Sequence, residues 1–359
     1  MSETVDKRRT GPQPSVPAES AAPRGPSGGR RRRPDLAGIA ASYGIIFAWA
    51  AVILVFSLLE PSKFFTTANL QTILGSQSVL LILALGLIIS LSVGEYDLSV
   101  AGAMSVSLVL VGYLNVVAGW AIIPAILAAL LSGVLVGVLN AALVVGLGVQ
   151  SLVATLGTGT LLVGLGVAIR GETTSGISSS LVDVIRYRII GLPLSFYLAL
   201  LFTVIVWYCV RFTPLGRYLY FVGANPSVAK LSGLPVNRIR AGALIATSFV
   251  GAMAGVVFAG TLAASDPNIS ASYLLPAFAA AFLGSTAITP GRFNAWGTFV
   301  AVYFLVTGIT GLQLLGLSGW IEDVFYGGSL VLAVSLSKLA AKYQIYRRSR
   351  ITRSGGAPG

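Results

Sequence analysis

Residues 79–114 read VLLILALGLIISLSVGEYDLSVAGAMSVSLVLVGYL, and this stretch decides the fold class. Two apolar runs, residues 79–93 and 100–114, enclose a short acidic segment that contains Glu95 and Asp97. An ionisable side chain within a membrane segment costs on the order of a few kcal/mol unless it faces water or a partner. The pattern therefore predicts that Glu95 and Asp97 lie on a pathway or at a membrane boundary.

The composition places the chain among integral membrane proteins. Apolar residues make up 55% of the 359 positions and charged residues only 10%, whereas charged residues form about a quarter of a soluble domain. Glycine occupies 42 positions, and small residues let membrane helices approach each other closely. We therefore expect an all-α polytopic membrane protein with tightly packed helices.

Side chains on which much enzyme chemistry depends are scarce. The chain has no histidine, and Cys209 is its only cysteine. Disulfides within the chain, clustered-thiol metal sites and histidine-based triads are thereby excluded. The sequence also has no Gly-x-x-x-x-Gly-Lys-Ser/Thr loop to cradle nucleotide phosphates. We expect a chain that is not an enzyme, has no ATPase motif of its own and binds no metal or cofactor.

Hydropathy predicts about ten membrane-spanning helices. A span needs about 20 apolar residues, and the candidates are residues 37–59, 71–92, 98–118, 122–146, 151–170, 194–211, 239–263, 272–289, 295–315 and 321–338. Ten spans put both termini on one side. Of the 24 Lys and Arg residues, all but Lys63, Arg170, Arg186 and Arg188 then share that side. Because basic residues accumulate on the cytoplasmic side, we expect both termini in the cytoplasm.

The two ends of the chain are expected to lie outside the membrane domain. Residues 1–36 combine Pro, Gly and Ser with a run of four arginines, residues 30–33, which is typical of a disordered, basic cytoplasmic tail. This tail anchors the first helix by the positive-inside rule or, alternatively, binds anionic lipid headgroups. Residues 37–340 form the predicted transmembrane domain, and residues 341–359 a second basic cytoplasmic tail.

The longest predicted cytoplasmic loop, residues 212–238, is too polar for a span. Within it, Asn225 is a suitable N-cap and Pro226 a suitable first helical residue, whereas Gly233 and Pro235 would end the helix. The loop therefore contains a short capped helix. Two interpretations are open, a plain connector and an element that docks a partner.

Three groups of residues form a specific pattern through their order and spacing: Gly94, Asp97-Leu98-Ser99-Val100 and Gly102; Gly223, Asn225, Ala229, Ser232, Gly233 and Leu234; and Pro267-Asn268, Phe282-Leu283-Gly284-Ser285-Thr286, Gly291-Arg292 and Trp296-Gly297-Thr298. In these groups the chain resembles the membrane permease subunits of ATP-binding-cassette importers for ribose-type monosaccharides. Glu95, Tyr96, Leu274, Pro290 and Phe293 depart from the family pattern.

The resemblance implies a type II ABC importer-like fold of two five-helix halves in opposite orientation, located in the bacterial inner membrane. It implies a second permease subunit, expected to be an identical copy, a cytoplasmic ABC ATPase and an extracytoplasmic sugar-binding protein. The short helix would be the coupling helix, which contacts the ATPase through Gly223, Asn225, Ala229, Leu231, Ser232, Gly233 and Leu234. Arg292 is either a second ATPase contact or a positive-inside charge.

The candidate pathway residues are Asp97, Ser99, Glu95 and Asn140, because carboxylates and amides accept or donate hydrogen bonds to sugar hydroxyls. Three of them have an alternative. The alternative for Asp97 is to cap the next helix, for Glu95 to be a solvated charge at the boundary, and for Asn140 to form an interhelical hydrogen bond.

Three other functions are compatible with parts of this pattern. A branched-chain amino acid permease shares the architecture, although the quoted patterns look more like the sugar branch. An ion-coupled secondary transporter would use Glu95 and Asp97 to carry a proton or cation, and the docking-like loop speaks against it. A membrane-embedded enzyme would need an acid, base and nucleophile constellation that this chain lacks.

Overall fold

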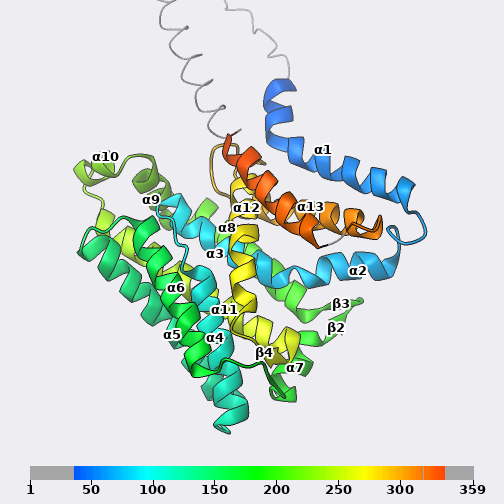
Figure 1. The fold of residues 1–359 in the computed structure, drawn as a ribbon. Coiled ribbons are helices and arrows are strands. Elements are labelled where there is room, and N and C mark those ends of the chain that lie inside the picture. The colour runs from blue at the N-terminus through cyan, green and yellow to red at the C-terminus, as the bar shows by residue number, and fades with distance from the viewer. Residues whose placement is uncertain (1–35, 318, 336–359) are drawn as a thin grey trace, which may run out of the picture. The chain divides into compact units, whose positions relative to one another are not determined.

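The computed structural model of the protein describes residues 36–317 and 319–335, which are almost entirely helical (Figure 1). The predicted tails, residues 1–36 and 341–359, lie outside the described residues except for Leu36. The α-helices are, in chain order, α1 (Leu36–Leu59), α2 (Thr67–Ser76), α3 (Ser78–Ser92), α4 (Val100–Gly112), α5 (Ile122–Ala141), α6 (Ser151–Ile169), α7 (Ser179–Arg186), α8 (Leu194–Phe212), α9 (Pro214–Ala224), α10 (Pro226–Leu231), α11 (Val236–Leu262), α12 (Leu274–Gly284) and α13 (Ala295–Leu314).

Shorter elements extend and connect these helices. Two π-helical turns, η1 (Tyr113–Val117) and η2 (Ala142–Gly146), prolong α4 and α5, and the 3-10 helix η3 (Ile269–Tyr273) leads into α12. A further helix over residues 320–335 reaches the end of the described chain. Two antiparallel ladders complete the fold: they pair β1 (Thr174–Ser175) with β4 (Ala264–Ser265), and β2 (Arg188–Ile189) with β3 (Leu192–Pro193).

The all-α polytopic class is confirmed. Within residues 36–317 and 319–335, eight helices are long and apolar enough to cross a membrane, and each coincides with a predicted span. The other two predicted spans correspond to the shorter apolar helix Ile269–Gly284 and to the helix over 320–335. The count of ten and the division into two inverted halves stay predictions.

The largest differences from the predicted span boundaries occur at two positions. The span expected at 71–92 begins earlier, at Thr67, because the Thr66 hydroxyl caps the helix by accepting the Asn69 amide at 3.1 Å. The span expected at 272–289 ends earlier, at Gly284. There the Asn294 side-chain amide donates to the Gly284 and Ala287 carbonyls at 3.2 and 3.0 Å, which closes a turn before α13.

Helix α3 forms the centre of the core. Residues 78–88 are all buried, so other helices cover this apolar segment on every side. Its neighbours are α8, α11, α12 and α13. This helix leads directly into the acidic segment, so that segment starts from a rigid support.

Helix α11 packs against α4 and α5 through small residues on both sides. A Cβ added at Gly137 of α5 would lie 2.5 Å from the Cα of Ile245, and one added at Gly255 of α11 would lie 2.5 Å from the Met104 carbonyl of α4. Gly133 and Gly251 make equivalent approaches. The small-residue spacing seen in the sequence is therefore used for close helix contact.

Candidate functional site

The acidic segment, residues 93–99, is a non-helical connection between α3 and α4. It turns at Gly94, whose φ of +85° is a left-handed conformation that suits glycine. The amides of Gly94 and Glu95 donate to the carbonyls of Leu91 and Ser90 at 3.1 and 3.0 Å, and so close the end of α3. After Gly94 the surroundings of the side chains alternate: Glu95 and Asp97 have polar partners, whereas Tyr96 and Leu98 line a cavity.

Asp97 is fully buried in a hydrogen-bond network. Its Oδ1 accepts the amide of Ser99 at 3.0 Å and the Ser99 hydroxyl at 2.6 Å. The Asn140 amide of α5 donates to the Ser99 Oγ at 2.6 Å, and the Thr158 hydroxyl of α6 donates to the Asn140 Oδ1 at 2.7 Å. The Ser248 hydroxyl of α11 lies 3.4 Å from the Asp97 Oδ2.

This network joins the acidic segment to α5, α6 and α11. It brings together three of the predicted pathway residues, Asp97, Ser99 and Asn140, and adds Thr158 and Ser248, which sequence reasoning missed. Burial raises the pKa of the Asp97 carboxyl to about 6, and its hydrogen bonds with Ser99 and Ser248 oppose that rise. Asp97 does not cap α4 in the way expected, because the N-cap is Ser99, no side chain caps the helix, and Asp97 accepts the Ser99 amide just before the helix begins.

Glu95 has a different environment from Asp97. Its side chain is 7% exposed, and its Oε1 pairs with the guanidinium of Arg240 in the first turns of α11. The expectation of a solvated boundary charge is therefore wrong. A buried carboxylate needs a counter-charge, and Arg240, distant in the sequence, supplies it.

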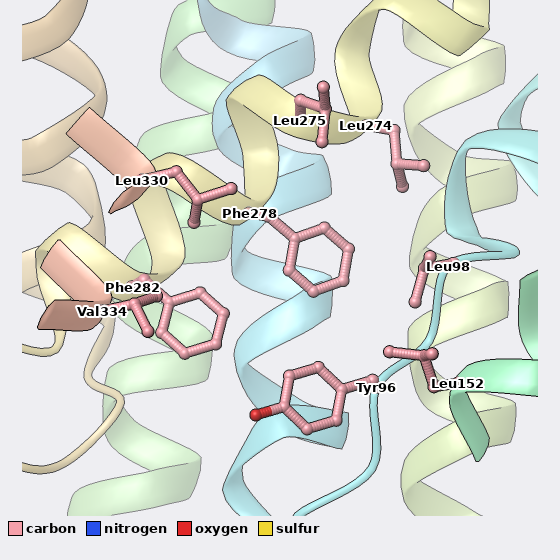
Figure 2. A pocket seen from close by; sticks show the side chains of 9 residues that line it. All are labelled: Tyr96, Leu98, Leu152, Leu274, Leu275, Phe278, Phe282, Leu330 and Val334. Carbon is pink, nitrogen blue, oxygen red and sulfur yellow. The ribbon is translucent and has the colours of Figure 1, made fainter. Parts of the chain in front are cut away.

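Tyr96 and Leu98 point the other way, into a cavity of about 330 Å³ (Figure 2). Its walls also contain α6, α12 and the helix over 320–335; the lining residues are Tyr96, Leu98, Leu152, Leu274, Leu275, Phe278, Phe282, Leu330 and Val334. The Tyr96 hydroxyl is the one polar side-chain group that Figure 2 draws in this lining. Asp97, Ser99, Glu95 and Asn140 are not among the lining residues.

The backbone at Tyr96 is fixed by the start of α6. The Tyr96 amide donates to the Ser151 Oγ at 3.3 Å, and the Thr155 hydroxyl donates to the Tyr96 carbonyl at 2.8 Å. The Leu98 amide donates to the same hydroxyl at 3.0 Å. On the cavity side the Tyr96 ring stacks on Phe282 with centroids 6.3 Å apart, and Phe282 stacks on Phe278 at 6.4 Å. The cavity thus has a continuous aromatic wall.

The predicted capping of the short helix in the loop 212–238 is confirmed. Helix α10 begins at Pro226, and the Asn225 Oδ1 accepts the amides of Ser227 and Val228 at 3.1 Å each. Gly233, with φ of +81°, turns the chain towards α11. The preceding helix α9 was not predicted. Its N-terminal Pro214 is a helix-start signal that could have indicated it.

One face of α10 is exposed and the other is anchored. Leu231 is 88% exposed and Val228 55% exposed. Ala229 is buried against Val93 and Val222. The predicted coupling residues Asn225, Ser232 and Leu234 line a hollow of about 550 Å³ between α9 and α10.

Gly223 of α9 touches the end of α3. A Cβ at this position would collide with the carbonyl of Ser92. Together with the burial of Ala229 against Val93, this contact connects the short helix directly to the residues that precede Glu95 and Asp97. Arg292 lies beside α9 as well, with its guanidinium carbon 3.7 Å from the centre of the Tyr220 ring, a distance at which a cation and an aromatic face attract.

Comparison with known proteins identifies the chain's family. The family model described as "Branched-chain amino acid transport system / permease component" matches residues 69–334. The chain is 28% identical over 305 residues to the D-allose transport system permease protein of Escherichia coli (strain K12), covering 84% of this chain and 92% of that protein.

Two further relatives are similar over comparable lengths. The ribose import permease protein of Haemophilus influenzae is 28% identical over 294 residues, 79% of this chain and 88% of that protein. The autoinducer 2 import system permease protein of Photorhabdus luminescens is 29% identical over 302 residues, 81% of this chain and 90% of that protein. No solved structure matches. The chain is therefore a multi-pass membrane protein that belongs to the branched-chain amino acid transport system / permease component family.

Proposed function

We propose that this chain is the membrane permease subunit of an ATP-driven importer for a monosaccharide or a related small polyol. The observation that carries the proposal is the similarity, over most of both chains, to permeases named for D-allose and ribose import. A branched-chain amino acid permease is the second candidate, because the family description names that substrate. An ion-coupled transporter is less well supported, since Arg240 neutralises Glu95 and protein encloses Asp97.

We place the substrate pathway along the cavity beside Tyr96. Small-molecule sites are typically apolar clefts with a few placed polar groups, and an aromatic ring with one hydroxyl suits the C–H face and the hydroxyls of a sugar. Asp97, Ser99 and Asn140 then hold the segment that presents Tyr96, and reach the sugar only if the segment moves. Glu95 fixes the same segment to α11 through Arg240.

A second permease subunit, expected to be an identical copy, would complete this pathway. Helix α6 exposes Leu156, Leu161 and Leu165, and the helix over 320–335 exposes Val331 and Leu332. Both helices border the cavity beside Tyr96. Two copies that meet through these faces would enclose the two cavities between them.

The coupling segment, residues 212–238, would receive the ATPase on the exposed face of α10. Its buried face touches Val93, and Gly223 touches Ser92. A rigid-body shift of α10 would thus reach the acidic segment without an intermediate element. Arg292 would stiffen this region through Tyr220. In this proposal α10 and both termini lie in the cytoplasm of a bacterial cell, and the extracytoplasmic sugar-binding protein binds on the opposite side of the membrane.

The test is to purify the full chain from its native membrane in mild detergent and to identify its stoichiometric partners. We expect an ATPase with phosphate-binding loops. Reconstitution of that complex with its binding protein should give ATP-dependent uptake of a labelled monosaccharide such as ribose or D-allose, and none of leucine. Uptake of leucine alone would favour the second candidate, and uptake driven by an ion gradient without an ATPase would contradict the importer.

A further inference from the structure

A second cavity of about 490 Å³ lies between α3, α8, α9 and α11, and the pathway does not use it. Its walls are mostly aliphatic and aromatic, with Phe202 and Val206 from α8 and Ala246 and Phe249 from α11. We call this cavity the α8–α11 groove. Among the described residues that line it, Arg238 is the only charged one.

The α8–α11 groove opens on a surface that the bilayer would cover. Helices α8 and α11 are both candidate membrane spans, and on α8 Leu201, Ile205 and Tyr208 are exposed. Because hydrocarbon surrounds such a surface, the groove is accessible to an acyl chain from the side. Gly242 adds to its width, since a Cβ at this position would meet no atom within 4 Å.

One end of the groove is basic. Arg238 lies in the first turn of α11, and Arg211 and Arg217 lie at the junction of α8 and α9, which borders the same end through Val210 and Gly216. All three arginines are exposed, and no carboxylate of the described residues lies within ion-pair distance of them. An arginine binds a phosphate group with paired hydrogen bonds.

We propose that the α8–α11 groove binds one anionic phospholipid, with an acyl chain between α8 and α11 and the phosphate on Arg238. The apolar wall fits the acyl chain, and the positive charge at one end fits the headgroup. Basic pockets between membrane helices are known to select anionic headgroups on the cytoplasmic side, the side on which we place Arg238. The lipid would also contact α9, the helix directly before α10.

Cys209 allows a direct test because it lines the groove and is the only cysteine in the chain. The rate at which a maleimide labels Cys209 is measured on the full chain in uncharged detergent, with phosphatidylglycerol or phosphatidylcholine of identical acyl chains added. We expect phosphatidylglycerol to slow labelling at least threefold more than phosphatidylcholine does. Arg238→Gln should remove this difference. Arg188→Gln, a matched change at the exposed strand β2 away from the groove, should preserve it.

Native mass spectrometry of the same samples provides an independent readout. The wild-type chain should retain phosphatidylglycerol, and Gly242→Leu, which fills the groove, should lose it. Equal protection by both lipids, or protection that survives Arg238→Gln, would overturn the proposal. Protection that increases with protein concentration in the absence of lipid would assign the groove to a second protein chain instead, and would also overturn it.

Discussion

Tyr96 presents the clearest chemistry of any single residue in the proposed pathway. Its ring and hydroxyl face the cavity while its backbone is fixed to Ser151 and Thr155. Replacement by Ala removes both the stacking surface and the hydroxyl without disturbing those backbone bonds. We expect Tyr96→Ala to lower ATP-dependent sugar uptake in proteoliposomes at least tenfold, a loss of about 1.4 kcal/mol of interaction with the moving sugar.

The control for Tyr96 is another exposed tyrosine. Tyr187, which follows α7, is also exposed, and Tyr187→Ala should leave uptake within twofold of the wild type. Tyr96→Phe separates the two contributions, because it keeps the ring and removes the hydroxyl. Undiminished uptake by Tyr96→Ala, at equal protein level, would show that the pathway runs elsewhere.

At the scale of elements, the close contact of α4 and α11 can be tested with a pair of glycines on one helix. A methyl group at Gly251 would lie 2.6 Å from the Val100 carbonyl, whereas one at Gly242 meets nothing within 4 Å. Overpacking typically costs about 1–3 kcal/mol, and Ala for Gly in a helix gains up to about 1 kcal/mol. Gly251→Ala should therefore lower the midpoint of thermal unfolding in detergent by several degrees, and Gly242→Ala should leave it equal or higher. Equal midpoints for both variants would contradict the packing argument.

The long helices could be predicted from the sequence because hydropathy alone specifies them. Each apolar run of about 20 residues has only one stable conformation in lipid, a helix. Helix α7 and the two strand ladders were not predicted, because they are short and depend on tertiary contacts: the Arg186 guanidinium, for example, donates to the Thr261 carbonyl at 2.9 and 2.8 Å.

The candidate site was predictable in part for the same reason. Polar residues in apolar runs are conspicuous, so Asp97, Ser99 and Asn140 could be selected as a group. The partnership of Glu95 with Arg240 could not be predicted, because it joins residues 145 positions apart. The opposite orientations of Tyr96 and Asp97 could not be predicted either, because they depend on how α6 holds the backbone between them.

At the scale of the whole molecule, the proposed function requires that movement of α10 reach the acidic segment. Gly233 ends α10 with φ of +81°, and a side chain there would meet no atom within 4 Å. A substitution is therefore strained only through the backbone, and a left-handed conformation costs a non-glycine residue about 1–2 kcal/mol. Gly233→Val should shift α10 rather than unfold the chain. We expect normal insertion in the membrane, at least tenfold lower sugar uptake, and ATP hydrolysis that no longer responds to the loaded binding protein.

Gly148 supplies the matched control for this last prediction. It has φ of +74°, open space around its Cβ, and a position in the turn between α5 and α6, outside the coupling segment. Gly148→Val imposes the same kind of backbone strain, so its uptake should stay within twofold of the wild type if the effect at Gly233 is specific to α10. Full uptake by Gly233→Val would remove α10 from the coupling route. An equal loss of uptake in both variants would show that the defect comes from general backbone strain. The contacts of Ser92 with Gly223, and of Val93 with Ala229, would then serve packing and not coupling.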